Sequence, residues 1–298
     1  MTTDLRGRER MMDVAGVELC AESFGDPQAP PLLLLHGAAT SMDGWPADLC
    51  RLLAGAGWHV VRYDHRDTGR STTWPAGEPG YPGRALTEDA VVLTELLAAE
   101  AGGRVLLVGL SMGGGIAQEV ALRRPELVAG LVLVATTAVG GVEQELPGPL
   151  PELASWFESP PPPPDPSDPA ALVEAMVAAE RAFSGPDFDE HATRGTARDV
   201  VARSHDPAAA DNHWLVLGDD GDDGGGDDRH EPLDVRRLRV PTLVVHGGAD
   251  PLFPLPHGEA LAAAVPGARL LVVERMGHEV PPATTWPRLL DEVARMRR

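Results

Sequence analysis

One serine in this sequence has the surroundings of a catalytic nucleophile. Ser111 is the centre of Gly109-Leu110-Ser111-Met112-Gly113, with glycine at the first and last of the five places. The apolar run 104–110 leads into it, and the helix-forming stretch 111–123 leads out. A serine in a sharp turn between strand and helix is typical of a nucleophile elbow, and small neighbours let strand and helix approach closely. The pattern predicts Ser111 as a nucleophile.

A serine hydroxyl is a weak nucleophile at neutral pH and needs a neighbouring base. In elbow-type enzymes the acid and then the histidine follow the serine along the chain. Asp250 comes just after the apolar run 241–246, and His278 just after the run 269–273. Both positions lie beyond the carboxyl ends of predicted strands, where open α/β sheets place their sites. We therefore expect His278 to be the base and Asp250 the acid that orients it.

Acyl transfer also needs two backbone N–H groups directed at the developing negative oxygen. Met112 follows the nucleophile and is expected to supply one of them. The second is expected from the loop His36-Gly37-Ala38-Ala39, which follows the first buried apolar run. Ala38 is the chosen donor, and Gly37 alternatively serves only the sharp turn out of the strand.

The other histidines have weaker claims to catalysis. His246 ends an apolar run and is expected in the core, and His257 is expected to open a helix. His191, His205 and His213 could touch a substrate, although solvated side chains are the simpler expectation. No histidines or acids have the spacing of zinc ligands, so neither a metal site nor a cofactor is expected.

The elements that must position these groups form an α/β pattern. Val17–Phe24 alternates loosely and predicts an edge strand. Continuous apolar runs predict buried strands at 31–36, 58–64, 104–110 and 131–135, and the sheet is expected to resume with strands at 241–246 and 269–273. Helices are expected at 45–54, 86–100 and 111–123, and from about 286. Apolar strands that alternate with helices predict a mostly parallel central sheet flanked by helices.

The alternation breaks at 140–215, which is rich in proline and in helical stretches. We expect an inserted helical cap there, over a core formed by 1–139 and 216–298. Apolar side chains that could line a pocket, or equally well pack in a core, are Trp156, Phe157, Met176, Phe183, Trp214 and Phe253.

The chain has 298 residues and a net charge of −20. A polyanion or an acidic membrane surface would be repelled, so no nucleic acid and no membrane is expected as a partner. The acidic segment 218–228, with His230 just after it, lacks a calcium-loop motif and is expected to be a surface loop. Cys20 and Cys50 are expected to be buried thiols, and no secretion signal is evident, so a cytoplasmic monomer or homodimer is expected.

Charged residues also follow the second central strand, in the segment Tyr63–Ser71. A carboxylate–guanidinium pair is a common local brace, so a structural role is expected for this loop. Glu88 and Asp89 are expected to open a helix, where acids favour the N-terminus.

These motifs together resemble the α/β-hydrolase superfamily. The chain is most similar to the aclacinomycin methylesterases and related actinobacterial serine hydrolases. The likeness rests on Gly44–Pro46, Val61–Thr73, Val108–Gly113, Val240–Val244 and Met276–His278. It implies the fold, the three catalytic residues and hydrolysis of a carboxylic ester, in that family an anthracycline methyl ester.

The sequence thus predicts a serine hydrolase that acts on a small apolar or polyketide-like ester through an acyl-enzyme. Three alternatives stay open. Cofactor-free perhydrolases, also called haloperoxidases, share the machinery. Proline iminopeptidase-like aminopeptidases share it too, with cap acids that hold the substrate amine. A slow-turnover binder of small molecules would retain the same residues without rapid catalysis.

Overall fold

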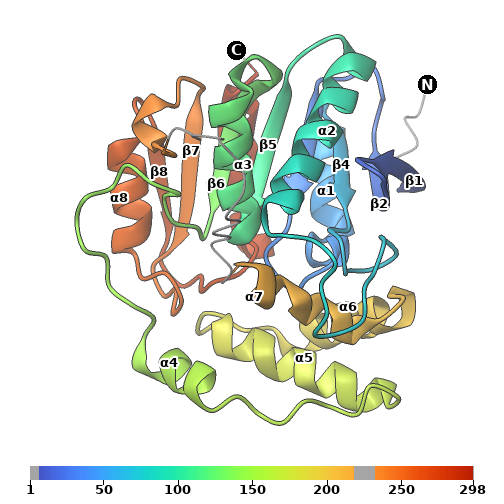
Figure 1. Ribbon diagram of the computed structural model, residues 1–298. Coiled ribbons are helices and arrows are strands. Elements are labelled where there is room, and N and C mark those ends of the chain that lie inside the picture. Colours follow the sequence, from blue (N-terminus) through green and yellow to red (C-terminus); the bar gives the residue numbers. More distant parts are fainter. Residues whose placement is uncertain (1–6, 218–231, 298) are drawn as a thin grey trace.

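An eight-stranded sheet forms the centre of the protein, in the order β1-β2-β4-β3-β5-β6-β7-β8 (Figure 1). The computed structural model describes residues 7–217 and 232–297. The strands are β1 (Arg8–Val14), β2 (Val17–Phe24), β3 (Pro31–Leu35), β4 (His59–Tyr63), β5 (Val105–Leu110), β6 (Val128–Val134), β7 (Thr242–Gly247) and β8 (Arg269–Val273). The pairs from β4 to β8 are parallel, whereas β2 is antiparallel to β1 and β4.

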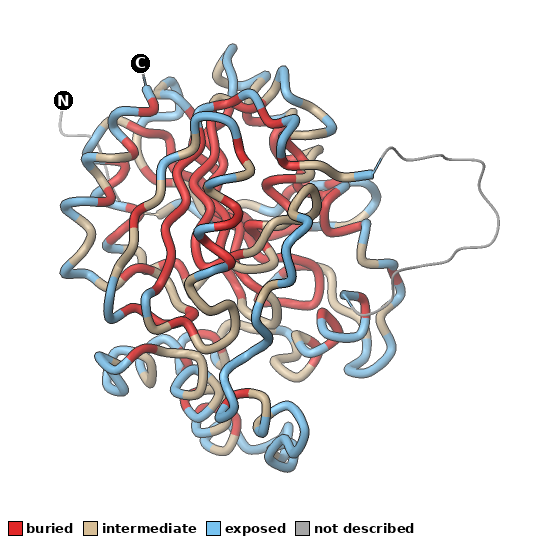
Figure 2. The backbone as a smooth tube through the Cα atoms, turned by 90° about the vertical axis from the view of Figure 1, so that its left-hand side faces the viewer, coloured by how far each residue is buried: buried red, intermediate tan, exposed pale blue. Residues whose placement is uncertain are grey.

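The central strands are buried on both faces. Every residue of β3, β4, β5 and β7 is buried, and Figure 2 shows this layer as the red centre of the molecule. Continuous runs of leucine and valine suit this position, because a strand of a parallel sheet has helices on both sides. The apolar runs in the sequence therefore predicted the central strands correctly.

Helices cover both faces of the sheet. One face packs on α2 (Arg84–Ala101), α3 (Met112–Arg123) and α8 (Pro256–Ala264), through side chains such as Leu93, Val120 and Leu261. The other face packs on α1 (Ala47–Gly55) and α9 (Trp286–Arg295), through side chains such as Leu53 and Val293. The chain is thus a doubly wound α/β structure, as the sequence predicts.

Four further helices lie together at the end of the sheet where the parallel strands finish (Figure 1). We call them the cap helices: α4 (Pro151–Glu158), α5 (Pro169–Phe183), α6 (Glu190–Arg203) and α7 (Asn212–Leu217). α5 and α6 share a small apolar cluster built on Val173, Val177 and Ala197. Most of their remaining surface is exposed (Figure 2). Such a small cluster cannot hold the cap in place alone, so contacts with the core must position it.

The prediction that Val17–Phe24 is an edge strand is wrong. β1 pairs with β2 along its whole length, from Arg8 opposite Ser23 to Val14 opposite Val17. β1 has only Met12 and Val14 buried, and its charged residues face solvent. Because an edge strand needs few apolar residues, this segment gave no apolar run for the sequence analysis to detect.

Two further observations concern the chain as a whole. The acidic segment 218–228 and His230 lie outside the described residues. Among the residues that are described, no helix combines the length and the apolar character needed to cross a membrane.

Candidate active site

Ser111 stands on a strained turn between β5 and α3. Its backbone has φ 51° and ψ −118°, a region that a residue with a side chain rarely adopts. The strain is held by neighbouring bonds: Ser111 N–H donates to the Val134 carbonyl at 3.0 Å, and Thr136 Oγ1 donates to the Ser111 carbonyl at 2.8 Å. Such a conformation costs about 1–3 kcal/mol, and such outliers cluster at functional sites. Ser111 itself is only partly buried, so it is accessible to a reactant.

The glycines around Ser111 permit this turn. A Cβ atom on Gly109 would lie 2.2 Å from the Gly113 carbonyl oxygen, and one on Gly113 would lie 2.3 Å from the Leu35 carbonyl oxygen. On Gly37 it would touch the Ser111 Cβ at 3.4 Å. Larger residues therefore cannot replace Gly109 or Gly113, and the loop after β3 lies within van der Waals distance of Ser111.

His278 and Asp250 form a buried pair. His278 Nδ1 lies 3.0 Å from Asp250 Oδ2 and 3.2 Å from Oδ1. Asp250 Oδ1 also accepts the N–H groups of Leu252 and Phe253, each at 2.9 Å. A carboxylate oxygen accepts these bonds, so the ring nitrogen that faces Asp250 is the one that donates. The contact therefore favours the tautomer of His278 with its proton on Nδ1, in which Nε2 is directed away from Asp250.

The cap contacts this histidine directly. The Phe183 carbonyl, at the end of α5, accepts the His278 N–H at 2.8 Å. The Phe183 ring centroid lies 6.0 Å from that of His278, and the Phe253 ring centroid lies 5.4 Å away. Segment 183–185 packs on segment 275–278 so closely that a Cβ on Gly277 would be 2.3 Å from Gly185 N. His278 is thus enclosed by aromatic rings, and α5 is part of its wall.

Three buried histidines surround the loop His36–Ala39, and we call them the histidine cluster: His36, His65 and His213. His36 Nδ1 accepts the Gly37 N–H at 2.8 Å, and His213 Nδ1 accepts the Ala39 N–H at 3.0 Å. His65 Nε2 lies 3.3 Å from the His36 carbonyl oxygen. The backbone of this loop is therefore held by imidazole rings at three points, one of them from cap helix α7.

Burial keeps the histidine cluster neutral. It lowers the pKa of His36 to about 4 and that of His65 to about 3, and it also lowers the pKa of His213. The charge of His278 lowers the pKa of His36 as well, which places the loop within electrostatic reach of the Asp250–His278 pair. The neutral form is the one that can accept from backbone N–H groups.

The structure corrects the simpler expectation for His213. A solvated side chain was favoured, but the ring has no exposed surface. His191 and His205 are exposed. His246 is buried, as expected, and donates from Nε2 to the Phe253 carbonyl at 2.7 Å, while His257 lies in the first turn of α8.

Two polar residues of the cap, one largely buried and one fully buried, join it to the loops after β3 and β4. Arg203, at the end of α6, donates to both oxygens of Asp64, at 2.8 and 2.6 Å, and to Asp43 at 2.7 Å. Asn212, at the start of α7, donates to Asp67 Oδ2 and to the Pro75 carbonyl, and its Oδ1 accepts the Gly77 N–H at 2.7 Å. The segment Tyr63–Ser71 thus has a structural role, as expected, and it also binds the cap to the core.

Asp89 does not open a helix, contrary to expectation. It lies one turn inside α2, is 1% exposed, and receives two hydrogen bonds from Arg66, at 2.6 and 2.7 Å. Burial raises the pKa of Asp89, while its bonds with Arg66 act against this rise. The apolar residues next to Asp89 in the sequence lie on the face of α2 that packs against the core. Asp89 lies on the same face, so its carboxylate is inside the protein.

The apolar residues predicted for a pocket divide into two groups. Phe183 and Phe253 lie against His278, and Phe157 reaches the site through Phe183, with 6.0 Å between ring centroids. Met176 packs against the apolar cluster of the cap. Trp156 is partly buried, and Trp214 is 46% exposed. The sequence could not separate these groups, because contact with His278 depends on how the cap docks.

A charged residue of α5 also faces this region. Glu180 is one turn before Phe183 and has solvent contact, yet enough protein surrounds it that burial raises its pKa. The charge of Glu279 raises this pKa further, and that of His278 lowers it. Glu180 therefore lies near the end of α5 that contacts His278.

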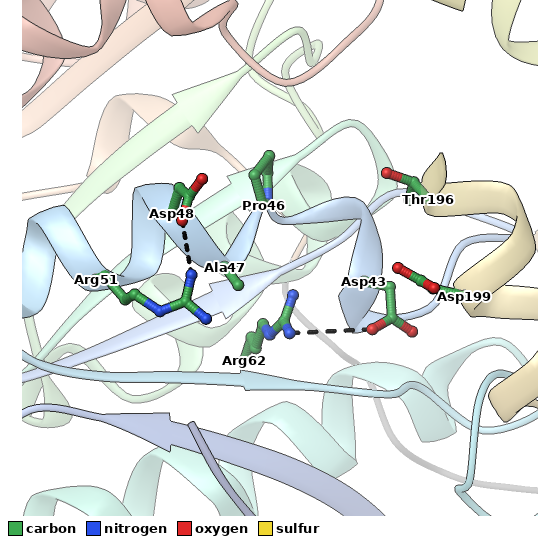
Figure 3. A pocket seen from close by; sticks show the side chains of 8 residues that line it. All are labelled: Asp43, Pro46, Ala47, Asp48, Arg51, Arg62, Thr196 and Asp199. Carbon is green, nitrogen blue, oxygen red and sulfur yellow. Dashed lines mark hydrogen bonds and ion pairs between the residues drawn. The ribbon is translucent and has the colours of Figure 1, made fainter. Parts of the chain in front are cut away.

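A separate polar pocket of about 260 Å³ lies where α6 faces the start of α1 (Figure 3). Asp43, Arg62 and Asp199 are among the side chains directed toward it, and Arg62 forms an ion pair with Asp43. Ser111, Asp250 and His278 are not among its lining residues. The pocket thus marks the outer side of the cap–core contact rather than the surroundings of Ser111.

Sequence reasoning missed the residues that hold the loop after β3. The signal for His36 was its place next to Gly37 at the end of an apolar run. His65 and His213 had no such signal. The bonds of His213 join segments 147 and 174 residues apart in the chain, and His65 contacts His36 across 29 residues. The cysteines were placed correctly: both are buried, and burial raises the pKa of each thiol to about 12.

Comparison with known proteins agrees with this architecture. Residues 30–281 match the family described as alpha/beta hydrolase fold. The chain is 30% identical to rhodomycin D methylesterase DauP of Streptomyces sp. strain C5 and 29% identical to DnrP of Streptomyces peucetius, in each case over 93% of this chain and 94% of the relative. These relatives confirm the resemblance drawn from the sequence motifs.

A solved structure shares the fold at lower identity. A serine hydrolase involved in carbazole degradation, the CarC enzyme, superimposes with a TM-score of 0.71 and 20% identity, over 98% of this chain and 99% of that one. The family match covers most of the chain, and the sheet order, the elbow after β5 and the flanking helices are in accord with it. The chain therefore belongs to the α/β-hydrolase family.

Proposed function

We propose that this protein is a serine hydrolase that cleaves a carboxylic ester of a small apolar or polyketide-like molecule through an acyl-enzyme. Its place in the family, with methylesterases as relatives over nearly the whole chain, makes it a carboxylic ester hydrolase. The observation that carries the serine mechanism is the strained backbone of Ser111 at the tip of β5. Such outliers cluster at functional sites, and this one stands at a strand-to-helix turn with a nucleophilic side chain.

In the proposed first step, Ser111 Oγ attacks the ester carbonyl and His278 Nε2 takes its proton. Asp250 holds the imidazole with its proton on Nδ1 and stabilises the imidazolium that forms. The alcohol leaves with a proton from His278. Water, activated by the same nitrogen, then releases the acid and restores Ser111.

The oxyanion of each step is stabilised by the N–H groups of Met112 and Ala38. α3 begins at Met112, so this N–H has no partner within the helix. Ala38 stands between Gly37 and Ala39, whose N–H groups bond to the rings of His36 and His213. The contact between Gly37 and Ser111 supports this assignment, because it brings the loop next to the nucleophile.

The methylesterase relatives and the aromatic side chains around His278 support an apolar ester. Phe183 and Phe253 supply flat apolar surface beside the base. The test is a panel of p-nitrophenyl and methyl esters in which the acyl and alcohol parts vary separately. Turnover of apolar esters by the wild type, lost in Ser111→Ala at unchanged melting temperature, is the expected result. Equal turnover by Ser111→Ala would refute the mechanism.

One observation favours a second candidate function. Aminopeptidases of this fold need cap acids that hold a substrate amine, and Glu180 is an exposed cap carboxylate one turn before Phe183, whose carbonyl accepts the His278 N–H. Proline p-nitroanilide separates the two functions. Hydrolysis of this amide at a rate above that of matched esters, lost in Glu180→Gln, would favour the aminopeptidase. No turnover of it by the wild type leaves the esterase.

A further inference from the structure

His213 is a buried histidine of the cap that the proposed mechanism does not use. It lies on α7, has no exposed surface, and contacts two loops of the core. Its Nδ1 lies 3.0 Å from Ala39 N, and its Nε2 lies 2.8 Å from the Arg66 carbonyl oxygen. An N–H can only donate and a carbonyl can only accept, so Nδ1 accepts and Nε2 carries the proton.

The loop after β3 has a strained backbone at Ala39, the residue whose N–H donates to His213. Ala39 has φ 55°, in the left-handed region that residues other than glycine rarely adopt. The bond from Ala39 N–H to His213 is therefore part of what maintains this conformation. Ala38, the proposed oxyanion donor, is the preceding residue, and the direction of its N–H depends on the same turn.

We propose that His213 is a positioning residue of the reaction: it fixes the loop after β3 so that the Ala38 N–H is directed at the oxyanion. The inference rests on the proposed function. It means that docking of the cap completes the oxyanion hole, because the acceptor for Ala39 comes from α7. His213 touches neither the substrate nor the reacting atoms.

The groups around His213 keep its Nδ1 unprotonated, so that this nitrogen can accept a hydrogen bond. The His65 ring faces it at 6.0 Å between centroids, and burial lowers the pKa of both rings. Asp67 favours protonation of His213, but its carboxylate already accepts from Trp74 N, Tyr81 Oη and Asn212 Nδ2. A proton on Nδ1 would face the Ala39 N–H and break the contact.

Two substitutions distinguish the effect of the Nδ1 acceptor of His213 from the effect of packing by its ring. In His213→Asn the amide oxygen takes the place of Nδ1 and can still accept from Ala39. In His213→Gln the amide reaches the place of Nε2, so the Arg66 contact is retained and the Ala39 contact is lost. The readouts are kcat and KM for a p-nitrophenyl ester, and Ki for a trifluoromethyl ketone, which forms an oxyanion adduct on the serine.

We expect His213→Gln to lower kcat by about 10- to 100-fold and to raise Ki by a similar factor, with KM little changed, because a misdirected oxyanion donor loses part of its effect. His213→Asn should recover most of this loss. Asn212→Ala is the matched control: it removes the adjacent cap–core bonds but no bond to the loop. It should lower the melting temperature and change kcat and Ki much less than His213→Gln does.

Several outcomes would overturn the inference. Wild-type kcat and Ki in His213→Gln would do so, as would equal losses in the Gln and Asn variants, since ring packing rather than the acceptor would then matter. If His213→Gln does not fold, ¹⁵N NMR of the wild type decides. An unprotonated Nδ1 and a protonated Nε2 support the inference, and the opposite tautomer or a charged ring contradicts it.

Failure of the proposed function gives a different result. A wild type that hydrolyses no ester and is not labelled by a fluorophosphonate refutes the serine mechanism, and the inference with it. An active wild type with an unaffected Gln variant refutes the inference alone.

Discussion

Asp250 and His278 are 28 residues apart in the chain, yet His278 Nδ1 lies 3.0 Å from Asp250 Oδ2. The sheet explains the contact. β7 and β8 are parallel neighbours, so the loops that follow them leave the same edge of the sheet side by side. Asp250 is 2% exposed and is held by two backbone N–H groups, which leaves one orientation for the imidazole. The pair is thus built before any substrate arrives.

From this pair we predict that Asp250→Asn lowers kcat by about 10³–10⁴-fold, with a much smaller change in KM. An amide in this place does not hold the imidazole with its proton on Nδ1 and does not stabilise the imidazolium. The measurement is steady-state hydrolysis of a p-nitrophenyl ester. Asp189→Asn, at the exposed N-cap of α6, is the control and should behave as the wild type, because asparagine caps a helix equally well. A kcat within tenfold of the wild type in Asp250→Asn would contradict the proposed role.

The elbow gives a prediction about stability. Gly113→Ala should lower the free energy of unfolding by about 3 kcal/mol or abolish folding, because the added methyl would lie 2.3 Å from a backbone carbonyl that cannot move aside. Gly115→Ala, two residues on in the same helix, meets its nearest neighbour at 3.6 Å. It should be neutral or slightly stabilising, because alanine favours the helix. Urea denaturation of both variants measures the difference. Equal stabilities would show that the turn can accommodate the added methyl group.

Docking of the cap depends on a buried ion pair. Arg203→Met should lower the free energy of unfolding by about 3–5 kcal/mol, because it leaves the carboxylate of Asp64 buried without its charge partner. Arg194→Met, on the same helix, removes exposed ion pairs with Glu174 and Glu190 and should change stability by less than about 1 kcal/mol. Both values come from urea denaturation curves. An equal loss of stability in Arg194→Met and Arg203→Met would show that the ion pair between Arg203 and Asp64 is not what holds the cap.

The histidine cluster predicts sensitivity to acid. The folded state holds His36 and His65 with pKa values of about 4 and about 3, below the ordinary value of about 6.5. Unfolding therefore takes up protons below about pH 6.5, and stability must fall as the pH falls from there toward the folded pKa values. Each histidine contributes a slope of about 1.4 kcal/mol per pH unit in this range.

His65→Gln checks this account, because glutamine reaches the place of Nε2 but does not titrate. Its free energy of unfolding, measured between pH 7 and pH 5, should depend less steeply on pH than that of the wild type. His191→Gln, at an exposed position on α6, is the control for the substitution itself. An unchanged slope in His65→Gln would mean that the ring is charged in the folded state.

The candidate site residues that the sequence could indicate are those that local patterns encode. The elbow needs glycine at fixed places around Ser111, and buried strands need continuous apolar runs, so both leave a signal in a few adjacent residues. Asp250 and His278 followed from their place just after two such runs. The relation between neighbouring parallel strands then accounts for the contact between them.

The missed features depend on contacts between distant segments. β1 has two buried residues, and its pairing with β2 supplies the rest of its stability. His213 looks like any polar residue of a helical stretch until α7 docks on the loops after β3 and β4. The pocket side chains were not separable for the same reason: Phe183 and Trp214 are both aromatic residues of the cap, and only the docked position brings one of them to His278.

The most direct test of the central claim is covalent labelling of Ser111. The protein is treated with a fluorophosphonate at neutral pH and digested, and the modified peptide is identified by mass spectrometry. The account predicts one phosphonate per chain, on Ser111, absent in Ser111→Ala and formed far more slowly in His278→Ala. A folded wild type that hydrolyses esters while Ser111 stays unmodified, or that is labelled as fast without His278, would contradict it.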